Sequence, residues 1–231
     1  MRPTPSALES LLAREPAIRR GAARHASGAG VRSGYPALDA ALPAGGWSRG
    51  SVTELLVERP GIGEFSLLLP ALRALTASGD WVAFVNPPHL PYAPALLAAG
   101  LPPERLLIVE SGRCEDTLWA AEQLLRAGSL AAVLVWVTRS TPARQRRLQL
   151  AAERGEAVAL VYRPGAARAE HSPVGARLAL SMRAGRLALE VIKARGGRTG
   201  SVSIEPESLP DRLPCHAPAR WNLHAARCGD A

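Results

Sequence analysis

Residues 55–66 have the spacing of a phosphate-binding loop, but they lack the side chains that bind phosphates and metal. A working loop reads GxxxxGK[ST]: its backbone N–H groups surround the phosphates, its lysine reaches the terminal phosphates and its hydroxyl holds Mg²⁺. Here Gly63 keeps the second glycine, whereas Glu58 replaces the first. Glu64 stands at the lysine position and Phe65 at the hydroxyl position. The pattern therefore predicts the frame of a nucleotide-binding loop without its chemistry.

The charge of Glu64 also opposes nucleotide binding. A carboxylate repels a triphosphate by roughly 1–4 kcal/mol per close pair, and the only lysine of the chain is Lys193. Gly61 and Gly63 still offer backbone N–H groups at the start of an expected helix, with Arg59 beside them. In the first turn of that helix, Glu64 would satisfy the helix dipole and occupy the place of the anion. We expect no cofactor and keep weak anion binding as the less favoured alternative.

Size and composition indicate one large globular domain with appended arms. The chain has 231 residues, of which 47% are hydrophobic, so it can bury a full core. Its formal net charge of +8 is compatible with an acidic partner such as nucleic acid. All but one of its 28 Lys and Arg residues are Arg, and it is rich in Ala, Gly and Pro, which a GC-rich genome explains equally well.

The cysteines and the hydropathy pattern favour a cytoplasmic protein. Cys114, Cys215 and Cys228 form no CxxC pair, which fits a reducing compartment. We see no secretory signal and no apolar run of about 20 residues that would cross a bilayer. Cys215, Cys228, His216 and His224 have the side chains of zinc ligands, but their spacing matches no closed zinc motif, so we expect no metal site.

Apolar runs alternate with helical stretches from residue 34 onward. We expect strands at 51–57, 81–85, 106–109, 131–137 and 157–162, and helices at 64–77, 116–127 and 141–154, the first kinked by Pro70. Continuous apolar strands separated by helices predict a parallel sheet covered on both faces. Two further strands, 176–182 and 187–193, have hairpin spacing, so the sheet should end in antiparallel strands. Residues 1–33 read as a basic N-terminal arm that begins with a short helix, 34–205 as the domain and 206–231 as a C-terminal tail.

The order of these pieces resembles a known family. Residues 34–42, 45–47 and 50–54 are similar to the lead-in of the phosphate loop in RecA-type recombinases, and the likeness continues to about residue 205. Residues 87–96, 118–123 and 147–153 are similar to the ImuA family, a RecA-like accessory of SOS-induced mutagenesis that is also described as SulA-like. The resemblance implies an α/β fold of the RecA-like, P-loop NTPase type, with a mostly parallel sheet and a degenerate P-loop.

The residues that match the catalytic positions of recombinases argue against an enzyme. The glutamate that polarises the attacking water would fall at Pro88, after the strand 81–85. The acidic residue that ends the Walker B strand would fall near Trp136 or Val137, neither of which holds Mg²⁺. Together with the missing lysine and hydroxyl, this makes four losses, and we expect no phosphoryl transfer.

The resemblance to ImuA implies a non-enzymatic adaptor of translesion DNA synthesis in the SOS response. Its implied partners are ImuB and an error-prone replicative-type DNA polymerase, with RecA as a further candidate. Two alternatives stay open: a DNA-binding RecA paralogue that modulates recombinase filaments, and a SulA-like cell-division inhibitor, which rests on fold analogy.

Two short loops replace the DNA-binding loops of recombinases, residues 138–142 and 163–173. Candidate contacts to DNA or a partner are Arg139, Arg144, Arg147, Arg163, Arg168 and Trp221. No aromatic side chains alternate with these arginines to stack bases, so we favour a solvated helix face over a DNA site. We expect Trp119 and Trp136 in the core and Trp221 as an anchor for a partner.

Overall fold

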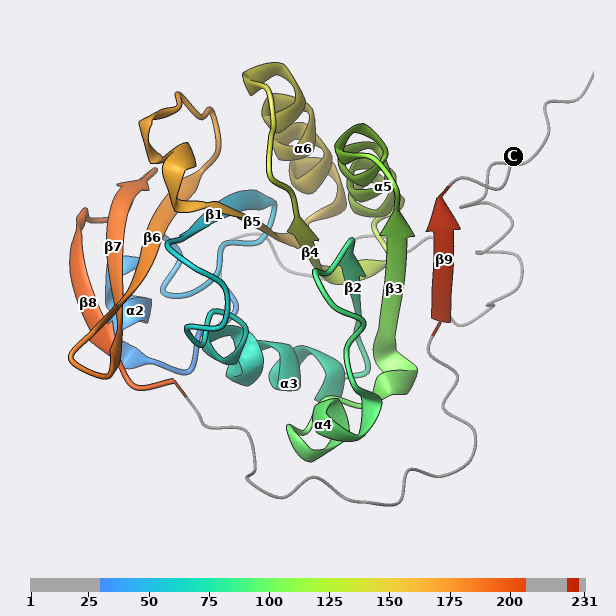
Figure 1. The fold of residues 1–231 in the computed structure, drawn as a ribbon, viewed down its shortest axis with the longest axis horizontal. Coiled ribbons are helices and arrows are strands. Elements are labelled where there is room, and N and C mark those ends of the chain that lie inside the picture. Colours follow the sequence, from blue (N-terminus) through green and yellow to red (C-terminus); the bar gives the residue numbers. More distant parts are fainter. Residues whose placement is uncertain (1–29, 207–223, 229–231) are drawn as a thin grey trace, which may run out of the picture.

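A single nine-stranded sheet organises the computed structural model, which describes residues 30–206 and 224–228 (Figure 1). The strand order is β8-β7-β6-β1-β5-β4-β2-β3-β9. The strands are β1 (Ser51–Val57), β2 (Trp81–Val85), β3 (Leu106–Ser111), β4 (Leu130–Trp136), β5 (Val158–Pro164), β6 (Ala176–Arg183), β7 (Arg186–Ala194), β8 (Gly200–Ile204) and β9 (His224–Cys228). In the order of the sheet, all neighbouring strands from β6 through β1, β5, β4, β2 and β3 to β9 are parallel. The two remaining pairs, β6–β7 and β7–β8, are antiparallel.

Helices cover both faces of the parallel part, as the apolar strands predict. The helices α5 (Cys114–Ala127) and α6 (Pro142–Gly155) lie on one face, and α3 (Leu69–Ala77) and α4 (Ala93–Ala98) lie on the other (Figure 1). The short helix α2 (Pro36–Ala41) packs near β8. Two clusters of buried apolar side chains, one on each face, form the core. The mixed α/β class and the antiparallel C-terminal strands are therefore confirmed.

Local sequence signals explain where the two long helices begin and end. Thr141 precedes α6, and its hydroxyl accepts a hydrogen bond from the N–H of Arg144 at 3.4 Å. Gly128 ends α5 with a φ of 64°, a conformation that glycine adopts without steric cost. Within the described ranges, no helix combines the length and apolar character needed to cross a membrane.

The helix predicted at 64–77 is confirmed except for its first residues. Residues Ser66–Leu68 form a 3-10 turn, η1, and α3 starts at Leu69. Pro70 therefore lies in the first turn of α3, where its missing N–H costs nothing, and it does not kink a longer helix. Glu64 consequently belongs to the loop and not to the first turn of a helix.

The predicted domain limits also need correction at both ends. Val31, assigned to the arm, is buried and pairs with Trp47 in an isolated bridge, and Ser33 is buried as well. In the predicted tail, β9 (His224–Cys228) extends the sheet by pairing with β3. The strand β8 was not predicted either. The rest of the arm and tail, including Trp221, lies outside the described residues.

Candidate functional site: a phosphate-type loop filled by the chain itself

The loop that follows β1 binds its own carboxylate. Gly61 and Gly63 have φ values of 82° and 92°, so both occupy the left-handed region that favours glycine. The N–H of Gly61 donates to Oε1 of Glu64 at 2.9 Å. An N–H group that could face a phosphate is thus paired with a side chain of the same loop. This agrees with the prediction that the Glu64 carboxylate takes the place of an anion, although it does so from the loop.

Tyr162, on β5, holds the backbone of this loop. Its hydroxyl donates to the carbonyl oxygen of Glu64 at 3.1 Å. Burial raises the pKa of Tyr162 well above its ordinary value, and the nearby Glu64 charge raises it further. The phenol therefore stays protonated and keeps donating its hydrogen bond to the loop.

Aromatic side chains from the loop and from β2, β4 and β5 pack against one another beside this loop. Phe65 contacts Phe84 edge-on with ring centroids 5.7 Å apart, and Phe84 contacts Trp136 in the same way at 5.9 Å. Trp136 stacks on Tyr162, with centroids 4.8 Å apart and planes 9° from parallel. The prediction that Trp136 packs in the core is confirmed in part, because the ring packs against the core cluster but is only partly buried. The rings of Phe65, Phe84 and Trp136 carry no oxygen that could bind Mg²⁺.

An apolar groove borders this aromatic cluster. The groove has a volume of about 240 Å³. It is lined by Glu64, Phe65, Phe84, Pro87, Pro88, His89, Pro91, Tyr92, Ala95, Leu96, Ala99 and Trp136. Leu90 and Tyr92, in the segment before α4, are 60% and 58% exposed. Pro88 thus lies on the wall of this depression.

A buried ionic cluster joins the centre of the sheet to the second loop. Glu54, on β1, pairs with Arg163 on β5 at 3.2 Å and with Arg177 on β6 at 2.7 Å. Gln145 of α6 donates to the same carboxylate at 2.8 Å. The side chains of Glu54 and Arg163 are 1% and 0% exposed, so the prediction of Arg163 as a DNA or partner contact is wrong. The Arg163 guanidinium pairs with Glu54 and also with Glu170, at 2.7 Å.

Arg177 also fixes the backbone of the second loop. Its guanidinium donates to the carbonyl oxygens of Ala167 at 2.8 Å and Glu170 at 2.9 Å. These residues belong to the 3-10 segment η3 (Gly165–Ala169) and the turn that follows it. Sequence analysis missed the cluster, although Glu54, Arg163 and Arg177 each stand in or beside an apolar strand, where an unpaired charge would be costly.

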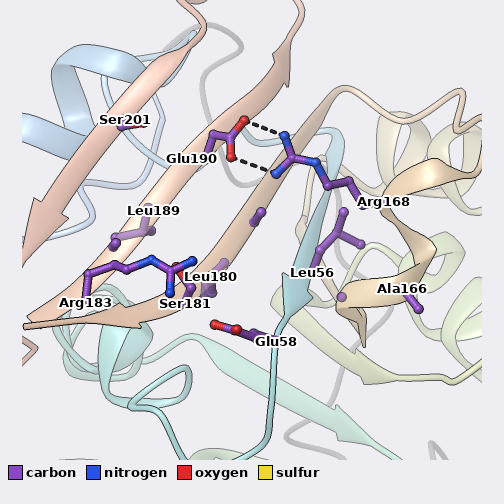
Figure 2. Close-up of a pocket in the computed structure, with 13 residues that line it drawn as sticks. Leu56, Glu58, Ala166, Arg168, Leu180, Ser181, Arg183, Leu189, Glu190 and Ser201 are labelled. Carbon is purple, nitrogen blue, oxygen red and sulfur yellow. Dashed lines mark hydrogen bonds and ion pairs between the residues drawn. The ribbon is translucent and has the colours of Figure 1, made fainter.

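Arg168 lies on the surface but is also paired. Both terminal nitrogens of its guanidinium donate to Glu190 of β7, at 2.7 and 2.6 Å. This pairing raises the pKa of Arg168 and lowers the pKa of Glu190. Figure 2 shows the two side chains facing each other at one end of a hollow of about 560 Å³, with Glu58 and Arg183 at the other end. The hollow carries both charge signs and is no simple phosphate site.

The remaining candidate arginines lie on or near α6. Arg144 pairs with Glu115 at 3.0 Å and Arg147 with Glu122 at 2.9 Å, which agrees with a solvated, ion-paired helix face. Arg139 is exposed in the short loop before α6. Trp119 is 42% exposed on α5, so its assignment to the core is wrong.

The described part of the chain contains no cluster of His, Cys, Asp and Glu that could hold a metal ion. Two of the zinc-type residues, Cys215 and His216, lie outside it. Cys114 is a free cysteine. A hydrogen bond from the Thr138 hydroxyl lowers the pKa of the Cys114 thiol. Among the described residues, this hydroxyl is the only side chain that forms a hydrogen bond with the thiol.

Comparison with known proteins relates this region to a family of cell-division inhibitors. Residues 50–159, from the start of β1 into β5, match the family model described as "Cell division inhibitor SulA". The chain is similar to SulA. The protein of that name from Edwardsiella piscicida is 32% identical over 98 residues, which cover 42% of this chain and 58% of the relative. SulA from Serratia marcescens is 28% identical over 119 residues, covering 52% of this chain and 71% of the relative.

A recombinase and a solved structure complete the comparison. Protein RecA 1 from Myxococcus xanthus is 30% identical over 115 residues, covering 50% of this chain and 33% of the recombinase. The crystal structure of SulA from Pseudomonas aeruginosa is 28% identical, with a TM-score of 0.43, and the match covers 49% of this chain and 98% of that one. The chain thus spans little more than half the length of the first SulA relative. The similarity supports the SulA part of the resemblance, while membership of the ImuA family stays a prediction.

Proposed function

We propose that this protein is a non-enzymatic, SulA-like inhibitor of cell division, made in response to DNA damage and acting in the cytoplasm by binding its target protein directly. The observation that carries the proposal is the match of residues 50–159 to the SulA family. That segment contains the carboxylate-filled loop, most of the aromatic cluster and the apolar groove. A site built of packed aromatic rings and proline is suited to contacting protein and unsuited to hydrolysing a nucleotide.

We further propose that the domain is a RecA-type scaffold that has lost its enzymatic activity. Two features support this. The filled loop follows β1 at the carboxyl ends of parallel strands, the edge at which phosphate loops of α/β proteins bind nucleotides. The second feature is the similarity to a RecA protein over half of the chain. On this view, Glu64, Phe65, Pro88 and Trp136 replace the residues that hold and activate a nucleotide.

The proposed target is the cell-division GTPase of the same organism, and its polymerisation provides the assay. We expect the purified full-length chain to bind the GTPase saturably and to reduce both the polymer pelleted with GTP and the rate of GTP hydrolysis. Leu90→Ala is the first interface variant, because this exposed side chain belongs to the segment that borders the apolar groove. Trp119→Ala, at an exposed residue of α5 on the opposite face of the sheet, is its matched control. Absence of binding at about 10 μM, where micromolar affinity corresponds to ~8 kcal/mol, would remove this function.

A translesion adaptor is the second candidate, and the RecA similarity favours it. The strands β6, β7 and β8 lie beyond the segment that matches SulA, so this chain carries sheet structure that the match leaves unassigned. On this proposal the partners are ImuB and an error-prone polymerase. Pull-down of ImuB by the full chain, compared with a chain lacking residues 206–231, tests the adaptor. Binding to ImuB without binding to the GTPase would replace the first function with the second, and equal binding after truncation would exclude the C-terminal residues from the contact.

A DNA-binding RecA paralogue finds less support in the described residues. Of the arginines proposed to contact DNA, Arg163 is buried and three others are ion-paired with glutamates. Of these five arginines, only Arg139 is exposed and forms no ion pair with a described glutamate or aspartate. A phosphate backbone would have to compete with existing carboxylate partners at each of the other positions.

A further inference from the structure

The strand β8 (Gly200–Ile204) forms one edge of the sheet. Among the described residues it pairs on one side only, with β7, and it lies at the left margin of the molecule in Figure 1. In an antiparallel pair, every second residue turns its N–H and C=O groups toward the neighbouring strand, so the remaining residues of β8 turn theirs outward. Backbone groups that face outward from an edge are a template for a further strand.

β8 lacks the features that usually protect a sheet edge from pairing. Charged side chains, proline and bulges keep further strands from adding to an edge. The five residues of β8 include no charge and no proline, and their pairing with β7 runs without a shift of register. Gly200, Ser201 and Ser203 are exposed, whereas Val202 and Ile204 pack on the core cluster of one face. The strand can therefore pair with another strand along its whole length.

The helix α2 (Pro36–Ala41) packs beside β8 on the core face. The N–H of Arg198, just before β8, donates to the carbonyl oxygen of Ala41 at 3.4 Å, which joins the end of the helix to the start of the strand. The exposed residues of α2 are Pro36, Ala37 and Ala40, all small and uncharged. The neighbouring helix therefore adds no bulky or charged side chain that would repel a strand from this edge.

The charges at the two ends of β8 favour a second copy of the same chain as the occupant of the edge. Arg198 precedes the strand and Glu205 follows it, and both are exposed. If two copies pair antiparallel with Val202 opposite its own counterpart, Thr199 lies opposite Glu205 of the second copy, and Arg198 is next to it. Residues opposite each other point to the same face, so this register also continues the core face from one sheet to the other. A parallel pairing would place arginine beside arginine.

We propose that two copies of this chain associate through β8, which pairs antiparallel with β8 of the second copy and joins the two sheets. The contact is short, so we expect a reversible dimer with a dissociation constant of about 10 μM. The inference does not depend on the proposed function, because β8 lies outside the segment that matches SulA. No residue that lines the apolar groove belongs to α2 or β8, so the groove is not part of this contact.

Analytical ultracentrifugation of the full chain from about 1 to about 200 μM tests the dimer. The weight-average mass should rise from near that of the 24.4 kDa monomer to nearly twice this value. Ser201→Lys combined with Ser203→Lys places lysines opposite each other across the pair and should keep the mass at the monomer value throughout. Ala74→Lys combined with Ala77→Lys adds the same charges at exposed positions of α3 and should leave the association unchanged. Melting temperatures show whether each variant is folded.

A charge exchange tests the antiparallel arrangement and decides if the lysine variant is unfolded. Arg198→Glu and Glu205→Arg each place like charges at both ends of a homodimer, so each variant alone should have a dissociation constant raised at least about fivefold. An equimolar mixture of the two restores opposite charges at both ends. It should associate about as tightly as the unchanged chain.

Three results would overturn the proposal. A mass that stays at the monomer value up to about 200 μM would show that the edge does not pair with a second copy. Slow amide exchange in residues 200–204 of such a monomer would mean that the edge is covered within one copy. A dimer that persists in the folded lysine variant would use another surface, and a mixture that associates no more tightly than its components would exclude the antiparallel pairing.

Discussion

Replacing Glu54 with glutamine removes one charge from the most buried ionic group of the sheet. The Glu54 carboxylate accepts hydrogen bonds from Gln145 and Arg163 on one oxygen and from Arg177 on the other. A glutamine keeps the shape but has one accepting oxygen and one amide. Whichever way it turns, an amide N–H group faces at least one donor, and two guanidinium groups lose their shared negative partner.

The expected loss is large because these side chains are out of water. Breaking a buried ion pair by removing one partner costs about 3–5 kcal/mol, a substantial share of the ~5–15 kcal/mol that stabilises a typical domain. With a urea slope near 2 kcal/mol/M, the unfolding midpoint should fall by about 2 M. Arg163 keeps its contact with Glu170, whose side chain is 53% exposed, but an exposed carboxylate compensates weakly for a buried one.

Urea unfolding followed by circular dichroism measures the effect, and Glu170→Gln is the matched control. It changes the same kind of group on the same arginine but at the exposed end, where we expect a cost of less than about 1 kcal/mol. Equal shifts for Glu54→Gln and Glu170→Gln, or a shift below about 1 kcal/mol for Glu54→Gln, would refute the view that this cluster holds β1, β5 and β6 together.

Three further outcomes follow from single contacts. Gly155→Ala should destabilise the fold by about 1–3 kcal/mol, because a Cβ there would lie 1.9 Å from a backbone oxygen of α5. The control is Gly112→Ala, where a Cβ would meet open space. Equal melting temperatures of the two variants would contradict the close packing at Gly155. Because the pKa of Tyr162 is raised in the folded protein, its contribution to the free energy of unfolding is complete below the unfolded-state pKa of about 10. This contribution is lost as the pH rises from there toward the pKa of the folded state. Tyr162→Phe should therefore lose less stability than wild type between pH 10 and 11 in urea titrations, and a parallel loss would place the alkaline transition elsewhere. Arg168→Ala should change DNA affinity less than about twofold in a salt series, since both of its terminal nitrogens already bind Glu190; a large, salt-dependent loss would favour the DNA-binding alternative.

The parts of the fold that were predictable from sequence are those where apolar character is continuous. The strands 51–57 and 81–85 match β1 and β2 to the residue, because each is almost wholly buried and bounded by turn signals. β8 escaped prediction because Gly200–Ile204 is short, contains two serines and is mostly exposed at the sheet edge. The sequence misplaces the start of α3, because a proline inside an apolar helical stretch indicates a kink, whereas proline is equally favoured in a first turn.

The chemistry of the loop was predictable from residue types, but the pairing of charges was not. Glu64 at the lysine position already indicates a loop that repels phosphate, and its bond to the Gly61 N–H is a local contact over three residues. Arg163 looked like a free cation because its partner Glu54 lies 109 residues earlier. Trp119 looked like a core residue because hydrophobicity alone does not reveal which side of α5 faces the sheet.

Titration of the full-length protein with ATP in the presence of Mg²⁺, followed by isothermal calorimetry, tests the central claim most directly. The Glu64 carboxylate bound within its own loop, and the aromatic rings beyond it, predict no saturable heat up to about 1 mM nucleotide, the concentration at which even a ~4 kcal/mol interaction would register. Saturable, magnesium-dependent uptake with a micromolar dissociation constant would contradict the account, because it would require the phosphates to displace that carboxylate.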